Sequence, residues 1–368
     1  MSEPANPSPT PHAPVVWADP QREAAFTRWL DRIAGPQRLL PGSVRPASAD
    51  ASFRRYLRID RVPGGDETAS SRIIMDAPPD KEDCRPFVKV AALMAAAGLN
   101  VPRIIEWEEA SGFMLLDDLG TQTMIEAIVP DHPAANQPLY LSAVDALIAW
   151  QAASRPAVLP PYDRALLARE LALFPDWYVQ QHRGVKLEGR SREQLDGVFQ
   201  LIVERNLAAP AVYVHRDFMP RNLMMPADPA EPRLGVLDFQ DAVEGPITYD
   251  IASLMRDAFL SWDEEFVLDI TVRYWQRALK AGLPVNRDFG DFYRGVEWMG
   301  LQRHLKVAGI FARLTLRDGK PKYLADAPRF ISYIRATASR YRELAPLLRL
   351  VDDIEGTQAA TAYAFGRM

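Results

Sequence analysis

One stretch, residues 211–257, places polar residues directly after two short apolar runs. The first run leads into the octapeptide HRDFMPRN, which contains Asp217 and Asn222. The second run, residues 234–237, is followed by Asp238. Short apolar runs bounded by turn residues are typical of buried strands. The stretch therefore predicts two strands whose ends bring two carboxylates and one amide to the same place.

These residue types suit the transfer of a phosphoryl group. Such a transfer needs an aligned acceptor and neutralised phosphate oxygens more than covalent help. Asp217 is predicted to be the catalytic base that accepts the acceptor's proton. Asn222 and Asp238 are predicted to hold Mg²⁺, which prefers a few protein oxygens together with phosphate and water. The spacing matches the H-R-D-L-x-x-x-N and D-F-G motifs of kinases, with Gln240 in place of the glycine.

Two further residues are expected to support this loop. His215 is predicted to be a buried ring that bonds to the backbone. Asp250 precedes an apolar run, which suits a helix N-cap, and it is also expected to brace the loop. Only about a dozen residues separate Asp238 from Asp250, too few for the activation loop of a protein kinase, so we expect a small-molecule acceptor. The alternative for the whole stretch is a polar β-hairpin with acidic turn residues.

The chain is long enough to build two lobes around this motif. It has 368 residues, 48% of them hydrophobic, which is ample for sizeable cores. The formal net charge of -5 argues against general binding to nucleic acid or to anionic membranes. The single cysteine, Cys84, excludes an intramolecular disulfide and fits a reducing cytoplasm. No run is apolar enough to span a bilayer, and residues 1–20 lack the features of a secretory signal.

The N-terminal part predicts an antiparallel sheet with helices. Ser48 and Ser52 lie in a loop of small residues that could cover nucleotide phosphates, although an ordinary hairpin turn would look the same. Asp117 and Leu119 lie in the predicted hinge between two lobes, whose backbone groups could bind adenine. The predicted elements are a helix from about residue 20 to Gly35 and Pro36, strands within residues 45–76, a helix at residues 83–99, and strands at residues 103–107 and 113–116.

The third predicted strand, residues 72–76, lacks the lysine that kinases use to bind the α- and β-phosphates. Arg54, Arg58 and Arg72 are candidates to replace it, because guanidinium groups chelate phosphate well. Each of them is equally plausible as a solvated charge on a strand, and the sequence leaves the choice between them open.

After Gly120 the pattern becomes helical. Glu170 is a candidate to hydrogen-bond the hydroxyls of a ligand, and Trp177 is a candidate to stack on a sugar. The alternatives are a solvated charge for Glu170 and a place in the hydrophobic core for Trp177. The predicted helices are residues 139–153, residues 164–182 with a break or kink at Pro175, a helix beyond Trp262, and residues 330–347.

A basic group lies on a further helical pattern near residue 300. Lys306 and Arg313 fall on one stripe beside Gly309, which is expected to leave a gap, and Arg303 and His304 are nearby. As a substrate site this group would suit an anionic or neutral acceptor and repel a polycationic one. The alternative is a solvated helix face.

The sequence resembles the aminoglycoside phosphotransferase and choline kinase superfamily, and within it the branch of bacterial cell-wall anomeric sugar kinases. The stretches HRDFMPRNLM and LGVLDFQDAVEGPITYDIASLMRD carry the nucleotide-handling motif, while DFQDA, FPDWY and GLQRHLK point to the branch. The resemblance covers about residues 24–344. It implies an α+β, protein-kinase-like fold with two lobes, in which Asp217 is the base and Asn222 and Asp238 are Mg²⁺ ligands.

The same resemblance implies ATP-dependent phosphorylation of the C1 hydroxyl of N-acetylmuramic acid and N-acetylglucosamine, in peptidoglycan recycling. The basic group would then fit the lactyl carboxylate of a muramic acid. We expect a cytoplasmic monomer that binds a nucleotide and an amino sugar. Its expected parts are a disordered leader at residues 1–20, an N-lobe at residues 21–117, a C-lobe at residues 118–350, and a tail at residues 351–368.

Two other functions remain open. One is a kinase of another small alcohol, such as an aminoglycoside or choline, but a cationic acceptor would need an acidic or aromatic pocket rather than a basic helix. The other is a pseudokinase that binds nucleotide without transfer, as the missing strand lysine suggests. The joint presence of Asp217, Asn222 and Asp238 argues against it.

Overall fold

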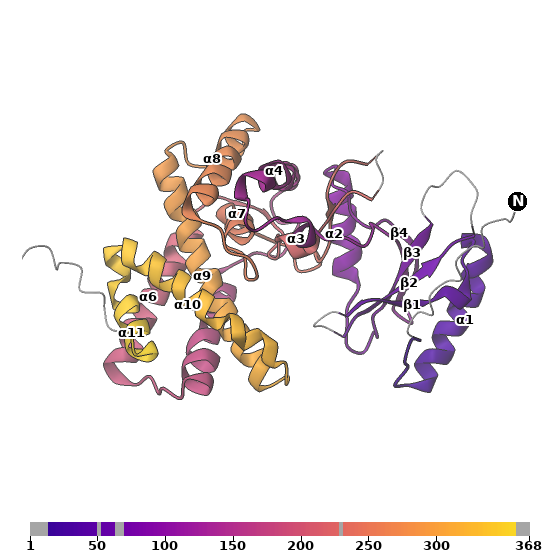
Figure 1. The fold of residues 1–368 in the computed structure, drawn as a ribbon, viewed down its shortest axis with the longest axis horizontal. Helices are drawn as coiled ribbons and strands as arrows, with labels where there is room; N and C mark the ends of the chain where they lie inside the picture. The colour runs from indigo at the N-terminus through magenta and orange to yellow at the C-terminus, as the bar shows by residue number, and fades with distance from the viewer. Residues whose placement is uncertain (1–13, 50–52, 63–69, 228–230, 358–368) are drawn as a thin grey trace, which may run out of the picture. The chain divides into compact units, whose positions relative to one another are not determined.

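The computed structural model describes residues 14–49, 53–62, 70–227 and 231–357 (Figure 1). Compactness divides the chain into two units. Unit 1 consists of Met1–Gln122 and Met224–Gln240, and unit 2 consists of Thr123–Leu223 and Asp241–Met368. The segment Met224–Gln240 joins unit 1 because its backbone bonds there: the amide of Val236 donates to the carbonyl of Asn100 at 2.8 Å. The sequence places this segment in the second lobe instead.

Unit 1 contains the strands β1 (Arg45–Ala49), β2 (Arg55–Asp60), β3 (Ser71–Asp76), β4 (Ile104–Glu108) and β5 (Phe113–Asp117). They form an antiparallel sheet in the order β1-β2-β3-β5-β4. Figure 1 shows α1 (Pro20–Gln37) and α2 (Arg85–Ala96) on either side of it. Because side chains alternate along a strand, Leu57 and Ile74 point to one face, where they pack with Trp29 of α1. The predicted sheet and helices of this unit are thus present.

The end of α1 differs from the prediction. The helix continues through Gly35 and Pro36 to Gln37 and stops where Arg38 takes the left-handed conformation, with φ 55°. The amide of Arg38 donates to the carbonyls of Ala34 and Gly35, which have no hydrogen-bond donor inside the helix.

Unit 2 is mainly helical. Its helices include α3 (Met124–Ala127), α4 (Gln137–Ala152), α5 (Arg164–Leu173), the π-helix Phe174–His182, α6 (Gly189–Leu207), α7 (Thr248–Met255), α8 (Glu264–Lys280), α9 (Phe289–Leu316), α10 (Ala327–Arg340) and α11 (Ala345–Glu355). A short antiparallel pair, β6 (Ala211–Val214) and β9 (Val243–Pro246), lies among them. None of the helices within the described ranges is long and apolar enough to cross a membrane.

The central helix of unit 2 is α9, which packs against α5, the π-helix, α6, α7 and α10. Gly309 permits a close approach, because a Cβ atom there would lie 2.3 Å from the carbonyl carbon of Leu173. The predicted gap beside Gly309 is therefore wrong: the backbone of Leu173 fills it.

Two local features of this unit test the helical patterns. The predicted break at Pro175 is confirmed, since α5 ends at Leu173 and the chain continues as a π-helix; proline has no amide for the α-helical ladder. The helix α6 was not predicted. It is mostly polar and exposed, and it buries Leu195, Val198 and Ile202 at helical spacing.

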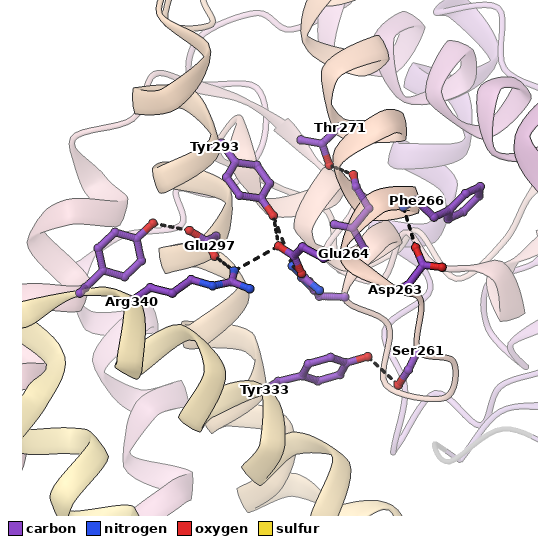
Figure 2. Close-up of polar contacts among 12 residues, drawn as sticks. Ser261, Asp263, Glu264, Phe266, Thr271, Tyr293, Glu297, Tyr333 and Arg340 are labelled. Atoms are coloured by element: carbon purple, nitrogen blue, oxygen red, sulfur yellow. Dashed lines mark hydrogen bonds and ion pairs between the residues drawn. The ribbon is translucent and has the colours of Figure 1, made fainter. Parts of the chain in front are cut away.

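A polar network ties α8, α9 and α10 together (Figure 2). Glu264 at the start of α8 accepts hydrogen bonds from the Tyr293 hydroxyl at 2.6 Å and from Arg256 at 2.7 Å. Arg340 of α10 pairs with Glu264 at 3.1 Å and also with Glu297 of α9. Burial alone would raise the pKa of Glu264, but the Tyr293 and Arg256 hydrogen bonds outweigh it and lower the pKa to about 2.

Candidate active site

The loop that follows β6 is held at its backbone by α7. Val214 at the end of β6 pairs with Val243 of β9. The Asp250 carboxylate then accepts hydrogen bonds from the amides of His215 and Arg216, at 2.7 and 3.0 Å. The expected brace of the loop is thus confirmed. The expected N-cap is wrong, because α7 begins at Thr248 and Asp250 lies inside its first turn. Burial raises the pKa of Asp250 to about 6.

The loop also bonds to itself and to α9. His215 is 1% exposed, as predicted, and its Nδ1 accepts a hydrogen bond from the amide of Asp217 at 3.3 Å. Arg216 has φ 78°, in the left-handed region that non-glycine residues rarely occupy. Nη1 of Arg303 donates to the Arg216 carbonyl at 2.7 Å. The loop backbone is therefore fixed from several directions.

Asp217 and Asn222 are brought together. Nδ2 of Asn222 donates to the backbone carbonyl of Asp217 at 2.9 Å, and Asp217 is half-buried. Because Nδ2 is the donor, Oδ1 is the Asn222 atom whose lone pairs suit a hard cation.

Asp238 lies in unit 1, after the short strand β8 (Gly235–Val236). Its φ is 62°, and its Oδ1 accepts a hydrogen bond from Nε2 of Gln240 at 2.8 Å. The ring of Phe239 stacks on Phe87 of α2, with the ring centres 4.8 Å apart. The next residue after Asp238 is thus packed against α2. Asn222 belongs to the other unit, so their shared metal stays a prediction.

A metal at this site would need other ligands as well. Within the described ranges, no group of three or more His, Cys, Asp or Glu side chains is placed to bind a metal. The two predicted oxygens fit Mg²⁺, which takes most of its ligands from phosphate and water.

The candidate phosphate loop is only partly described. Ser48 is exposed on β1, opposite Tyr56, and Ser52 lies outside the described residues. Arg54 is held by Glu82, which accepts from Nε and Nη2 at 3.2 Å each. Glu82 also accepts from the amide of Phe53 at 3.1 Å. Glu82 thereby fixes the start of β2, a role that the sequence does not signal.

The other two candidate arginines face carboxylates. Arg58 donates from Nε and Nη2 to Asp118, at 2.6 and 3.0 Å. Arg72 is 3% exposed and lies 3.8 Å from Asp117, which also pairs with Arg103 at 3.2 Å. All three arginines are thus engaged with carboxylates, and none is simply a solvated strand charge.

Leu119, the other hinge residue, packs inside unit 1. A Cβ atom on Gly235 would lie 2.8 Å from Cδ1 of Leu119, so the two residues are in close contact. The predicted contacts of the Asp117 and Leu119 backbone with adenine stay a prediction.

The substrate candidates of α9 are buried. Lys306 is 8% exposed and lies 2.9 Å from Glu170, which is itself 5% exposed. Arg303 is 4% exposed, with its guanidinium over the Tyr249 ring at 4.9 Å. The alternative of a solvated helix face is wrong for both, and so is that of a solvated charge for Glu170, because all three pack inside unit 2.

His304 and Trp177 have different environments. His304 is 2% exposed and stacks on Tyr333, with ring centres 4.5 Å apart, and burial lowers its pKa to about 3. It is therefore a neutral interior ring at physiological pH. Trp177 is half-buried in the π-helix Phe174–His182.

The sequence is similar to those of known kinases. Residues 43–286 match the model of the phosphotransferase enzyme family. The N-acetylmuramate/N-acetylglucosamine kinase of Pseudomonas aeruginosa is 51% identical over 350 residues, which are 93% of this chain and 100% of that protein. The kinase of the same name from Neisseria meningitidis is 46% identical over 339 residues, 92% of this chain and 97% of that protein.

Solved structures confirm the predicted protein-kinase-like fold. An ethanolamine kinase of Plasmodium vivax has a TM-score of 0.57 at 10% identity, over 91% of this chain and 93% of that chain. An aminoglycoside 2'-phosphotransferase-IIIa, solved with GDP, has a TM-score of 0.56 at 13% identity, over 86% and 99% of the two chains.

Proposed function

The chain belongs to the phosphotransferase enzyme family, and from this premise we propose that it transfers the γ-phosphoryl group of ATP to the C1 hydroxyl of N-acetylmuramic acid and N-acetylglucosamine. The observation that carries the proposal is the identity of 51% and 46% to two kinases named for these sugars, over 93% and 92% of this chain. Asp217, Asn222 and Asp238 all lie within the matched residues 43–286.

In the proposed reaction Asp217 accepts the proton of the C1 hydroxyl. The C1 oxygen forms a bond to the γ-phosphorus, and the bond from that phosphorus to the β–γ bridging oxygen breaks. ADP leaves with the electron pair, and the product is a sugar 1-phosphate. The anomeric hydroxyl is more acidic than an ordinary alcohol, which lightens the task of Asp217. The braced loop supports this role, because a base held in place needs no reorganisation.

Asn222 and Asp238 are proposed to hold Mg²⁺. When bound, the ion would neutralise charge on the phosphate oxygens. Support comes from the donor types: an amide that is oriented by its bond to the Asp217 carbonyl, and a carboxylate that is held by Gln240.

Arg54 is the arginine that we propose for the α- and β-phosphates. In protein kinases the strand lysine pairs with a glutamate of the following helix. Here Glu82 lies just before α2 and holds Arg54. Arg58 and Arg72 pair with Asp118 and Asp117, which lie at the end of β5 rather than just before α2. The serines of the loop, Ser48 and Ser52, would lie beside the same phosphates.

Other parts of the proposal rest mainly on the sequence. The backbone at Asp117 and Leu119 would bind adenine, and the half-buried Trp177 would contact the sugar. Glu170 and the basic residues of α9 are deeply buried. Their burial favours a role in supporting the loop that carries Asp217 over direct contact with the acceptor. We propose a cytoplasmic monomer that acts in the recycling of peptidoglycan.

The test is a phosphorus NMR assay of the purified protein with Mg²⁺, ATP and one acceptor at a time. The acceptors are N-acetylmuramic acid, N-acetylglucosamine, choline and an aminoglycoside. A product whose phosphorus couples to the anomeric proton of either N-acetyl sugar is expected. Transfer to choline or the aminoglycoside alone would refute the proposed acceptor. Nucleotide-dependent thermal stabilisation without any turnover would indicate a pseudokinase.

The variant Asp217→Asn tests the catalytic base. We expect kcat to fall by about 10²- to 10⁴-fold, the usual contribution of a general base, with nucleotide affinity nearly unchanged because the residue acts on the acceptor. The matched control is Asp353→Asn, at an exposed position of α11, which should keep full activity. Wild-type turnover in Asp217→Asn would refute the assignment.

A further inference from the structure

Glu170 of α5 contacts both α9 and the loop that follows β6, which carries Asp217. Its Oε1 accepts a hydrogen bond from Nη2 of Arg216 at 2.6 Å and lies 2.9 Å from Nζ of Lys306. Its Oε2 accepts a hydrogen bond from the hydroxyl of Tyr162. Two cations therefore share one carboxylate oxygen in the interior of unit 2, and Tyr162 fixes the other oxygen.

Electrostatic attraction favours the charged forms of Lys306 and Arg216, and the Asp217 carboxylate contributes to it. Burial alone would lower the pKa of Lys306, but Tyr249 and Glu170 outweigh it, and the pKa is raised. Asp217 adds to this raising effect, and it acts on the pKa of Arg216 in the same direction. Glu170 supplies one negative charge against these two cations. The Asp217 carboxylate supplies a second, which also acts on Arg303.

The backbone of Arg216 explains why such a cluster is needed. Its φ of 78° is costly for a residue with a side chain, and it persists only where surrounding contacts impose it. Arg303 of α9 holds the Arg216 carbonyl at 2.7 Å. Lys306 lies three residues further along α9, on the same face, and it reaches the Arg216 guanidinium through Glu170. One helix thus holds this residue at both its backbone and its side chain.

We propose that Lys306 is a positioning residue of the transfer reaction, which acts through Glu170 and Arg216 to fix the loop that carries Asp217. The inference rests on the proposed function, because it takes Asp217 as the base. Without the Lys306 ammonium group, Glu170 would lose one of the two cations that hold its Oε1. The anchor that Glu170 gives to the Arg216 side chain, and through it to the loop, would then be less fixed.

Steady-state kinetics test this role with Lys306→Met. We expect kcat to fall by about 10- to 100-fold, as small misplacements of catalytic groups do, while the KM values for ATP and sugar stay close to wild type. Lys306→Arg, which keeps the charge beside Glu170, should recover most of the lost kcat. Lys280→Met, at an exposed position of α8, is the matched control. An unchanged kcat in Lys306→Met, or a loss that appears only in KM, would overturn the inference.

Amide hydrogen exchange tests the same idea without turnover. In the peptide that covers residues 212–219, the amides that Asp250 binds should exchange faster in Lys306→Met than in wild type or Lys280→Met. Unchanged exchange overturns the inference. Lys306→Gln, which keeps a hydrogen-bond donor without the charge, is measured in the same way should Lys306→Met fail to fold. If the wild type phosphorylates neither sugar, the proposed function fails, and the exchange data still decide the role of Lys306.

Discussion

At the scale of single residues, Glu170 is expected to contribute strongly to stability. Its carboxylate pairs with both the Arg216 and the Lys306 cation, and both of these lie largely inside unit 2. Glu170→Gln removes this charge and leaves two facing cations in the interior. We expect a loss of about 3–5 kcal/mol in the free energy of unfolding, the usual cost of breaking a buried ion pair from one side.

Urea denaturation would measure this loss. The control is Glu188→Gln, because Glu188 pairs with Lys186 at 2.7 Å where both side chains are largely exposed, and exposed pairs contribute little. A Glu170→Gln variant as stable as the control would contradict the prediction.

The sequence could predict the residues that follow a fixed spacing. The eight-residue motif points to Asp217 and Asn222, which the structure brings together, and the second strand points to Asp238. Their roles in catalysis and metal binding stay predictions. The sequence could not predict the partners of Glu170, because Arg216 is 46 residues away and contacts it only in the folded chain. A helical stripe shows that residues share one face, but packing decides whether that face meets solvent.

Between elements, the approach of α9 to the end of α5 depends on Gly309. A Cβ atom there would lie 2.3 Å from backbone atoms of Leu173, which cannot move aside as a side chain could. Gly309→Ala should therefore destabilise the protein by about 1–3 kcal/mol through overpacking, although alanine favours helix more than glycine does.

Gly300 gives a control on the same helix. A Cβ atom there would meet nothing closer than Cγ of Arg256 at 3.8 Å, an ordinary contact. Gly300→Ala should thus be neutral or slightly stabilising, and the two melting temperatures should move in opposite directions or differ clearly. Equal melting temperatures for the two variants would refute the argument.

Strands and apolar helices were predictable as elements, because their burial follows a period of two or 3.6 residues. The sheet of unit 1 and the break at Pro175 illustrate this. The helix α6 was missed because it buries only a narrow stripe. The start of α7 was predicted too late in the chain. Asp250 has the residue type of an N-cap, but its carboxylate accepts hydrogen bonds from the loop amides of His215 and Arg216.

At the scale of the whole molecule, His304 makes stability depend on pH. Its pKa is about 3 in the folded chain because of burial, and about 6.5 in an unfolded chain. The unfolded state binds the extra proton between these values, so the contribution of His304 to stability is lost as the pH falls from about 6.5 to 3. The slope approaches about 1.4 kcal/mol per pH unit.

Comparison with His304→Phe isolates this effect. The phenyl ring can still stack on Tyr333 but does not titrate. Asp250 and Asp257 act in the opposite direction, because burial raises the pKa of each to about 6 and thus favours the folded state as the pH falls. The unfolding free energy of wild type minus that of the variant should decrease between pH 6.5 and 4. A constant difference would contradict the assignment.

The division into units was not predictable from local patterns, because it depends on where Met224–Gln240 bonds. The chain leaves unit 1 after Gln122 and returns to it before leaving again after Gln240. A nascent chain on the ribosome therefore cannot complete this unit until residue 240 of 368 has been synthesised. Until Val236 has been synthesised, its amide cannot form the hydrogen bond to the carbonyl of Asn100. Unit 1 therefore begins first but is completed only after much of unit 2 has been synthesised.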